Sequence, residues 1–324
     1  MEDAAVLGED VEQDEFRELR VDACLQGQRL DRALAIVVSG FSRSYLQQRI
    51  DAGDVLVDGQ PVTKASSKVR LGQRIGITLR ATPQSRAFVA QDLPIDTVYL
   101  DEHLRVIHKP AGMVVHPAPG NWQGTLLNGL LALDPAVLDL PRAGIVHRLD
   151  KDTSGLMVVA RTRAAMDALV RMIAAREVSR QYLAIGHRGW PGAAMREVNA
   201  PIGRDPVNRL RMAVVDLSRQ PGKTAQTTFQ CLDQNAEACL VRCILHTGRT
   251  HQIRVHMAHI GHPLLADALY GGQAAVNMNR QALHAWRLAF THPFTGQPHV
   301  WKATLPQDMA QALTLLGLRY NDSE

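Results

Sequence analysis

The 324-residue sequence predicts an α+β protein, with a small N-terminal αα-hairpin module followed by a larger domain. Three observations support this prediction. Apolar residues recur at helical spacing near the N-terminus, a polar segment follows them, and many short strand-like runs fill the rest of the chain. These runs do not alternate regularly with helices, which argues against a doubly wound fold and favours α+β.

The first twenty residues differ in charge from the rest of the chain. Residues 1–19 contain eight acidic residues against the single cation Arg17, so we expect an acidic disordered tail over residues 1–20. The whole chain nevertheless has a net charge of +4, and the remainder is therefore more basic than this total. A basic protein with 46% hydrophobic and 21% charged residues is typical of a globular protein with a polyanionic partner.

The N-terminal end and the cysteines indicate where the protein works. The acidic start lacks the cationic and apolar regions of a signal peptide, and no apolar run is long enough to cross a bilayer. The four cysteines show no CxxC spacing, which favours reduced thiols. We therefore expect a cytoplasmic protein with no membrane contact.

Residues 27–80 are predicted to form the small module. Leu30, Ala33 and Leu34 lie on one stripe of a first helix, Ser42 can cap a second helix, and Asp58-Gly59 is a favoured hairpin turn. Two helices followed by a hairpin resemble the S4 RNA-binding module. A solvated surface is the alternative interpretation of its cations, but their single sign favours RNA binding through Arg29, Arg32, Arg43, Arg49, Lys64 and Lys68.

Residues 81–93 are polar and contain Pro83, so they are predicted to be a linker to a domain over residues 94–324. This domain contains strand-like runs at residues 98–100, 104–107, 182–185, 227–229 and 240–244. An apolar stripe at Met166, Leu169 and Ile173 predicts a helix, and Ile253 and Met257 lie one turn apart on another.

The segment from His147 to Gly155 is the most informative part of the domain. It lies between two apolar runs, Gly144–Val146 and Leu156–Ala160, which are predicted to be buried strands. A charged loop between such strands can hold a carboxylate, Asp150 or Asp152, for chemistry. Composition alone slightly favours the alternative interpretation, a solvated turn.

Three other segments accompany this loop in a fixed order. Lys109–Pro117 contains two prolines and a glycine, which predict a bent structural loop. The others are Arg180–Ala184, on a predicted strand, and His246–Arg254, in which Gly248 suits a turn and Thr250 a helix cap. Together with the His147–Gly155 loop, these segments resemble RNA pseudouridine synthases of the large-ribosomal-subunit type.

The resemblance implies a role for each matching residue. It implies that Asp150 is the catalytic aspartate, that Tyr182 lines the site and stacks on a base, and that Arg249 pairs with Asp150. Arg148 is implied to fill the gap left by a flipped base. It also implies a mixed, mostly antiparallel sheet with flanking helices.

The implied reaction is isomerisation of specific uridines in large-subunit ribosomal RNA, by base flipping. The glycosidic C–N bond breaks and a C–C bond forms, without redox change, so no cofactor is expected. Asp150 acts as nucleophile or as base; the sequence leaves both open. The expected partner is an rRNA stem-loop, reached in pre-ribosomal particles, and the protein is expected to be a monomer.

Five histidines between residues 246 and 262 raise the alternative of a metal site. Their spacing lacks the HExxH pattern, so we expect no metal, and predict that they contact RNA or satisfy hydrogen bonds. Two other functions are compatible with parts of the sequence. One is a non-catalytic RNA-binding protein, and the other is a hydrolase that uses Asp150 and Asp152 as an acid/base pair.

Overall fold

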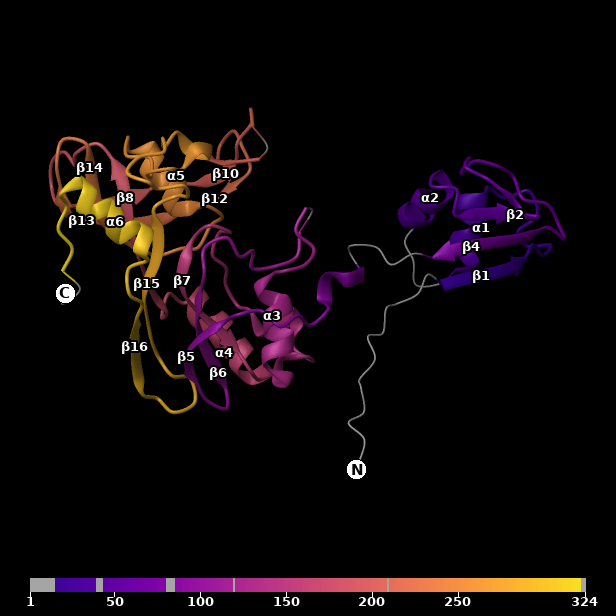
Figure 1. Ribbon diagram of the computed structural model, residues 1–324, viewed down its shortest axis with the longest axis horizontal. Coiled ribbons are helices and arrows are strands. Elements are labelled where there is room, and N and C mark those ends of the chain that lie inside the picture. The colour runs from indigo at the N-terminus through magenta and orange to yellow at the C-terminus, as the bar shows by residue number, and fades with distance from the viewer. Residues whose placement is uncertain (1–14, 39–42, 80–84, 119, 209, 322–324) are drawn as a thin grey trace, which may run out of the picture. The chain divides into compact units, whose positions relative to one another are not determined.

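The computed structural model describes residues 15–38, 43–79, 85–118, 120–208 and 210–321. The chain forms two compact units, Met1–Arg86 and Ala87–Glu324 (Figure 1). Each unit has a hydrophobic core of its own. In the part of the chain that the structure describes, no helix is long and apolar enough to cross a bilayer.

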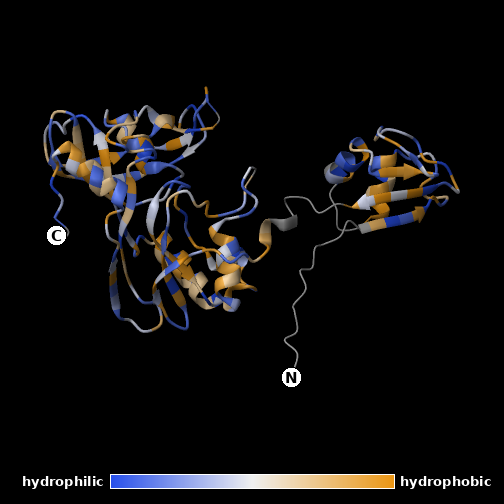
Figure 2. Ribbon diagram, viewed as in Figure 1, coloured by the Kyte–Doolittle hydropathy of each residue, from blue (hydrophilic) through white to orange (hydrophobic). Residues whose placement is uncertain are grey.

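The small unit packs two helices on an antiparallel sheet. The helices are α1 (Leu30–Val37) and α2 (Arg43–Asp51), and the strand order is β1 (Glu15–Arg20), β4 (Arg74–Leu79), β2 (Val55–Val57) and β3 (Gln60–Pro61). Asp58 and Gly59 both have positive φ, as the predicted hairpin turn requires. Figure 2 shows apolar β4 and a largely hydrophilic α2. Ser42, the predicted cap of α2, lies outside the described residues.

A buried carboxylate links the two helices of the small unit. Asp31 on α1 is fully buried and accepts hydrogen bonds from Arg29 at 3.1 Å, Arg43 at 2.7 Å and Gln47 at 2.8 Å. The hydrogen bonds from Arg29, helped by those from Arg43 and Gln47, hold the pKa of Asp31 well below its usual range despite its burial. Two of the predicted RNA-binding cations, Arg29 and Arg43, therefore also hold the module together.

Strand β1 corrects the prediction of a disordered tail for residues 15–20. It pairs with β4 along its whole length, from Glu15 opposite Leu79 to Arg20 opposite Arg74. The ring of Phe16 lies against Gly76, where any side chain would collide with it. The hydrogen bonds to β4 and the contact between Phe16 and Gly76 order this segment despite its acidic side chains. The local composition reveals neither of these two interactions. Residues 1–14 of the predicted tail lie outside the described residues.

The second half of the predicted linker is packed onto the large unit. The short 3-10 helix η1 spans Ser85–Phe88, and the side-chain amide of Asn128 donates to the carbonyls of Ala87 and Val89. The prediction of a linker up to residue 93 was therefore too long, because Asn128 supplies hydrogen bonds that the local sequence does not reveal. Residues 81–84 of the linker lie outside the described residues.

A nine-stranded sheet organises the large unit. Its order is β5 (Asp96–Leu100), β6 (Leu104–Lys109), β7 (Ser154–Ala160), β15 (Leu283–Thr291), β8 (Ser179–His187), β14 (Ala238–Leu245), β13 (Gln226–Gln234) and β9 (Met195–Asn199), with β16 (Pro298–Lys302) paired to β15. Strands β7 and β15 are parallel, and the other neighbours are antiparallel. This confirms the mixed, mostly antiparallel sheet. A smaller sheet has the order β11 (Met212–Val214), β10 (Ile202–Arg204), β12 (Gly222–Lys223).

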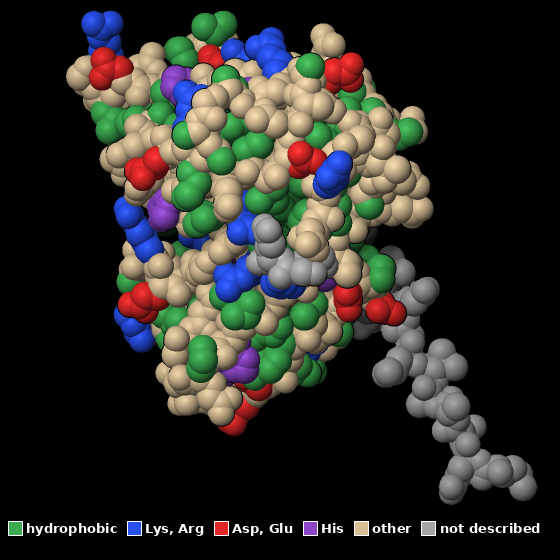
Figure 3. Space-filling view, turned by 90° about the vertical axis from the view of Figure 1, so that its left-hand side faces the viewer, with side chains coloured by type: hydrophobic (Ala, Val, Ile, Leu, Met, Phe, Trp, Pro, Cys, Tyr) green, Lys and Arg blue, Asp and Glu red, His purple; other side chains and the backbone are tan. Residues whose placement is uncertain are grey.

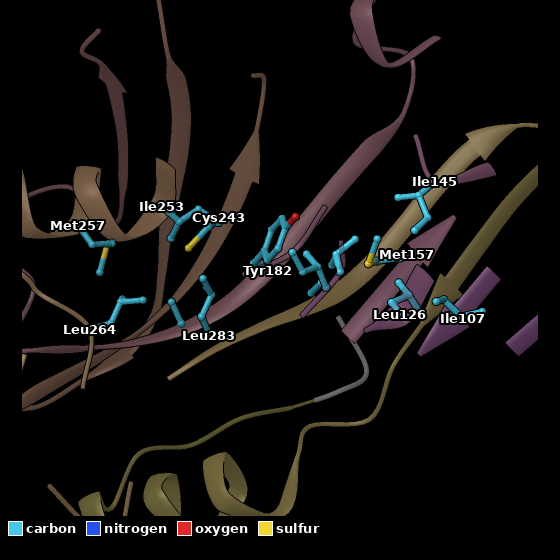
Figure 4. Packing of buried hydrophobic residues seen from close by; sticks show 14 of the residues in the cluster. Ile107, Leu126, Ile145, Met157, Tyr182, Cys243, Ile253, Met257, Leu264 and Leu283 are labelled. Carbon is cyan, nitrogen blue, oxygen red and sulfur yellow. The ribbon is translucent and has the colours of Figure 1, made fainter. Parts of the chain in front are cut away.

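Helices cover both faces of the large sheet. Helices α3 (Leu126–Leu133) and α5 (Gln252–His259) share one apolar cluster with Ile107, Tyr182 and Val241. On the opposite face, α4 (Arg163–Ala174) packs on β6 and β7, and α6 (Gln307–Leu316) packs on β8 and β14. Figure 4 shows Tyr182 midway along the first cluster, between the residues near Ile253 and those near Ile107.

The run Gly144–Val146 is not the strand that its apolar residues predict. Pro141–Gly144 forms a 3-10 segment, and only Ile145 makes an isolated bridge, to Val159. Gly144 has φ +74°, and a Cβ there would collide with the carbonyl of Ala160. The chain turns at this glycine instead of extending.

Strand β7 begins where two backbones come into close contact. Only Ser154 and Gly155 pair with β15, opposite His284 and Ala285. Gly155 has φ +118°, and a Cβ at this position would collide with the backbone of Ala285. The loop that carries Asp150 therefore leads directly into the parallel contact that joins the two parts of the sheet.

Candidate active site

A cavity of about 400 Å³ opens beside the loop that precedes β7. Its walls come from this loop, the start of β8, the turn after β14 and the first turn of α5. Segments far apart in the sequence are brought together here, including Asp150, Tyr182 and Arg254. This volume is within the range of small-ligand sites.

The loop that carries Asp150 is held by a buried lysine. Lys109, at the end of β6, has no exposed surface, and its ammonium donates to the carbonyls of Pro110 at 2.7 Å, Met113 at 2.9 Å and Lys151 at 3.0 Å. Burial lowers the pKa of Lys109 to about 8, so the side chain is mainly an ammonium at neutral pH. The lysine thus ties the bent loop at residues 110–113 to the loop of Asp150. These contacts support the prediction that Lys109–Pro117 forms a bent structural loop.

The carboxylate of Asp150 faces the cavity beside one arginine. Its side chain is 15% exposed, and Arg254 Nη1 lies 3.0 Å from Asp150 Oδ2. The Nε and Nη2 atoms of Arg254 both donate to Asp267 at 2.8 Å, and the guanidinium lies over the ring of Tyr270. Although burial opposes it, hydrogen bonding to Asp267 and the charge of Asp150 raise the pKa of Arg254 above its ordinary value. Arg254 therefore stays charged and is fixed in position by Asp267.

His251, the residue immediately before α5, also lies near Asp150. It adopts a left-handed conformation with φ 56°, and its Nδ1 lies 2.7 Å from the hydroxyl of Tyr270. Its Nε2 is 3.9 Å from Asp150 Oδ1. Burial lowers the pKa of His251, against the effect of Asp150, so the ring is neutral at neutral pH. Asp150 is thus paired with one permanent cation and has a neutral imidazole beside it.

Tyr182 supplies a flat apolar wall. It is 6% exposed and lies on β8 among the cluster shown in Figure 4. Burial raises the pKa of Tyr182 to about 12, so the ring remains a neutral phenol. A neutral aromatic ring beside a carboxylate can stack on a nucleobase while the carboxylate reacts with it or with its sugar.

Comparisons with known proteins match both units of the chain. The model of the family RNA pseudouridylate synthase matches residues 103–259, and the S4 domain model matches residues 28–75. A Nitrosomonas europaea protein named ribosomal large subunit pseudouridine synthase D is 47% identical over 306 residues, which cover 91% of this chain and 86% of the relative. A Salmonella typhimurium protein of the same name is 44% identical over 311 residues, covering 91% and 93%.

The chain belongs to the RNA pseudouridylate synthase family. It is therefore an RNA pseudouridine synthase, an isomerase, and it carries an S4 domain. The solved structure of human RNA pseudouridylate synthase domain containing 4 has a TM-score of 0.55 at 24% identity, over 70% of this chain and 95% of that one, and agrees with the fold.

The pairing predicted for Arg249 in this pseudouridine synthase is wrong. Arg254, not Arg249, lies beside Asp150, whereas Arg249 Nε donates to the carbonyl of Thr224 at 3.0 Å. The reason is the start of α5: the helix is preceded by His251 in a left-handed conformation, so the predicted cap at Thr250 is also absent, and the buried side of the first turn carries Arg254. Both arginines lie in the segment His246–Arg254, which resembles the family. Which of them faces Asp150 depends on where α5 begins and on which side of its first turn is buried.

Of the other residues predicted for the site, some line the cavity and one does not. Arg148 is exposed and lines the cavity, as does Arg249. Asp152 is absent from the cavity wall, so the structure does not bring it together with Asp150 as an acid/base pair. Asp267 and Tyr270 are not among the residues predicted for the site, because their contribution is to hold Arg254 and His251 through contacts that only the folded structure reveals.

The clustered histidines satisfy hydrogen bonds. His246 lies 2.9 Å from the hydroxyl of Thr228, and His256 bridges Thr227 and the carbonyl of Ala200. His262 is 3.1 Å from the carbonyl of His187. Over the described ranges, no group of histidine, cysteine and acidic side chains could hold a metal ion.

Proposed function

We propose that this synthase converts specific uridines to pseudouridine in large-subunit ribosomal RNA, with Asp150 as its catalytic aspartate. The observation that carries the proposal is the accessible carboxylate of Asp150, held beside a cavity by Arg254. The substrate class is supported by the relatives, whose names state that they act on the large ribosomal subunit.

In this proposal the target uridine leaves its RNA helix and enters the cavity. Chemistry on a base requires this exposure, and the walls of the cavity offer room for one nucleoside. Tyr182 stacks on the uracil, and the exposed Arg148 at the cavity fills the gap in the RNA. Asp150 acts on the sugar or the uracil as nucleophile or base, while the C1′–N1 bond breaks. The uracil then turns, C1′ bonds to C5, and the proton of C5 is lost as N1 gains one.

Residues 27–80 are proposed to bind RNA and residues 94–324 to carry out the chemistry. Arg32, Lys64 and Lys68 are exposed, and within the described part of the chain they have no carboxylate partner. On the face of the large unit that Figure 3 shows, Lys and Arg side chains gather near the middle while Asp and Glu are more scattered. Such cations favour a polyanion, here a stem-loop in a pre-ribosomal particle, bound by a cytoplasmic monomer.

Pseudouridine mapping in ribosomal RNA tests the proposal. Cells that lack the protein should lose pseudouridine at one or a few large-subunit positions, and wild-type protein should restore them while Asp150→Asn should not. Unchanged rRNA pseudouridines would contradict the proposal. The triple variant Arg32→Gln, Lys64→Gln, Lys68→Gln should weaken RNA binding and reduce its salt slope, whereas Arg163→Gln, an exposed cation already paired with Asp167, should not.

A further inference from the structure

Arg180 is a buried cation in the wall of the cavity. It lies on β8 two residues before Tyr182, so the two side chains are on the same side of the strand. Both line the cavity, and Arg180 is 7% exposed. Its terminal Nη1 lies beside the turn at Gly248, where an added Cβ would be 3.0 Å away.

Arg180 differs from the other buried arginines because it has no anionic partner. Three arginines are buried in the described part of the chain. Arg105 pairs with Asp134 at 3.1 Å, and Arg254 pairs with Asp267 and Asp150. Arg180 makes no ion pair in the same part of the chain, and its Nε is buried without a hydrogen-bond partner. A buried charge without a partner costs considerable free energy, so such a residue is expected to serve a ligand.

The neighbours of Arg180 cannot neutralise it. The imidazole of His147 accepts a hydrogen bond from the backbone of Val158, and burial together with the charge of Arg180 lowers the pKa of His147 to about 3. Tyr182 is a neutral phenol, and Asp150 is paired with Arg254. Of the two buried guanidiniums in the cavity wall, Arg180 is therefore the one whose counter-ion the described protein does not supply.

We propose that Arg180 binds a phosphate group of the RNA backbone beside the flipped uridine. This proposal rests on the proposed function, because it assumes that a uridine enters the cavity next to Asp150. A guanidinium presents paired N–H donors that match phosphate oxygens, and a full negative charge compensates a buried cation better than a uracil carbonyl does. Arg180 then acts as a positioning residue that fixes the sugar relative to Asp150.

Free nucleotides provide a first test that does not depend on the identity of the RNA. Melting temperatures are measured with uridine, uridine 5′-monophosphate and uridine 3′-monophosphate, for wild type, Arg180→Met and Arg176→Met. Arg176 is the matched control, because it lines the same cavity but is exposed and bonded to Gln226. One monophosphate should raise the melting temperature of wild type and Arg176→Met more than uridine does, and this advantage should vanish in Arg180→Met. Equal gains in all three proteins, or no advantage over uridine in wild type, would overturn the proposal.

A neutral phosphate analogue provides a second test, on a substrate stem-loop. A methylphosphonate on the flank chosen by the first test should lower kcat/KM about 10- to 100-fold in wild type, as expected for the loss of one hydrogen bond to a charged group. In Arg180→Met the same substitution should cost less than about 3-fold, since the contact is already gone. Equal losses in both proteins would contradict the contact. A wild-type protein that binds the monophosphate but modifies no rRNA stem-loop would instead contradict the proposed function alone.

Folding controls accompany both tests. Removing a buried cation that has no partner should leave the melting temperature of ligand-free Arg180→Met unchanged or raise it. If Arg180 were needed for the fold instead, this variant would melt well below wild type, which would count against the proposal. Arg180→Lys keeps the charge without the planar fork and should retain part of the monophosphate advantage.

Discussion

The two units of this protein each contain an aspartate held by arginine, and the two aspartates are held differently. Asp31 in the small unit is fully buried and accepts hydrogen bonds from Arg29, Arg43 and Gln47. Asp150 in the large unit keeps 15% of its side chain exposed and, among the residues that the structure describes, has a single arginine partner, Arg254.

The comparison separates a carboxylate that stabilises from one that is available to react. The partners of Asp31 enclose it, while Arg29 and Arg43 themselves remain about half exposed, at 49% and 52%. Around Asp150 it is the arginine that is the more buried partner: Arg254 is buried and fixed by Asp267, whereas the aspartate faces a cavity. The same pair of residue types therefore links two helices in one unit and holds the proposed catalytic carboxylate in the other.

The largest expected effect that distinguishes the two aspartates is on the rate of catalysis. Asp150→Asn should reduce pseudouridine formation below about a thousandth of wild type without changing the fold, since an essential group is lost. Asp31→Asn is the matched control and should leave kcat on a short stem-loop nearly unchanged. Single-turnover assays measure both. Substantial activity in Asp150→Asn would remove this residue from the mechanism.

The second-largest expected effect is a difference in kcat between substitutions of Arg254 and of Arg249. Arg254→Lys should lower kcat about 10- to 100-fold, because a lysine cannot bond Asp150 and Asp267 together. Arg249→Lys should change kcat little, since Arg249 bonds the carbonyl of Thr224. RNA affinity is measured beside kcat for each variant. A larger loss of kcat in Arg249→Lys than in Arg254→Lys would restore the pairing that the sequence suggested.

Asp31→Asn should destabilise the small unit by about 1–3 kcal/mol, because it removes the charge that joins α1 to α2. Hydrogen exchange of the β4 amides should accelerate accordingly. All four tryptophans lie beyond residue 120, in the large unit, so their fluorescence transition in urea should stay where it is. A shift of the tryptophan transition alone would contradict the role given to Asp31.

Mild acid should produce the smallest difference between the units. All thirteen histidines lie in the large unit, and burial lowers the pKa of His147 and of His284 to about 3. The unfolded chain binds protons near pH 6.5 where these folded side chains do not, so the stability of the large unit falls as the pH drops below 6.5 toward 3.

The loss between pH 7 and 6 should be under about 1 kcal/mol for each imidazole. The contribution of Asp31 is lost in the same direction but at a lower pH: its lowered pKa stabilises the small unit above the unfolded value near 3.9, and this stabilisation is lost only below that value. Tryptophan fluorescence and β4 amide exchange, followed at pH 7, 6 and 5, separate the two. If the small unit lost stability at a higher pH than the large unit, the predicted order would be wrong.

Much of the fold could be predicted from local pattern. Runs such as Leu104–Ile107 and Leu240–Ile244 became strands because short apolar segments must be buried. Strand β1 and the structured end of the linker were not predicted, since they depend on partners distant in sequence, Gly76 and Asn128. A local pattern contains no information about such partners.

The site shows the same division. Asp150 and Tyr182 lie in segments long enough to be recognised, and both line the cavity. Choosing between Arg249 and Arg254 required the rotation of α5, which follows from the left-handed conformation of His251. The isolation of Arg180 is likewise invisible in the sequence, because the absence of a partner is a property of three-dimensional packing.

The contact between Gly155 and Ala285 has a consequence for how this enzyme tolerates genetic change. Position 155 carries no reactive group, yet every alternative side chain would force apart the two backbones that meet beneath the loop of Asp150. In a mutational scan under selection for activity, we expect position 155 to be as intolerant as position 150. The two positions would fail differently: variants at 150 would accumulate as folded, inactive protein, whereas variants at 155 would be lost from the soluble pool.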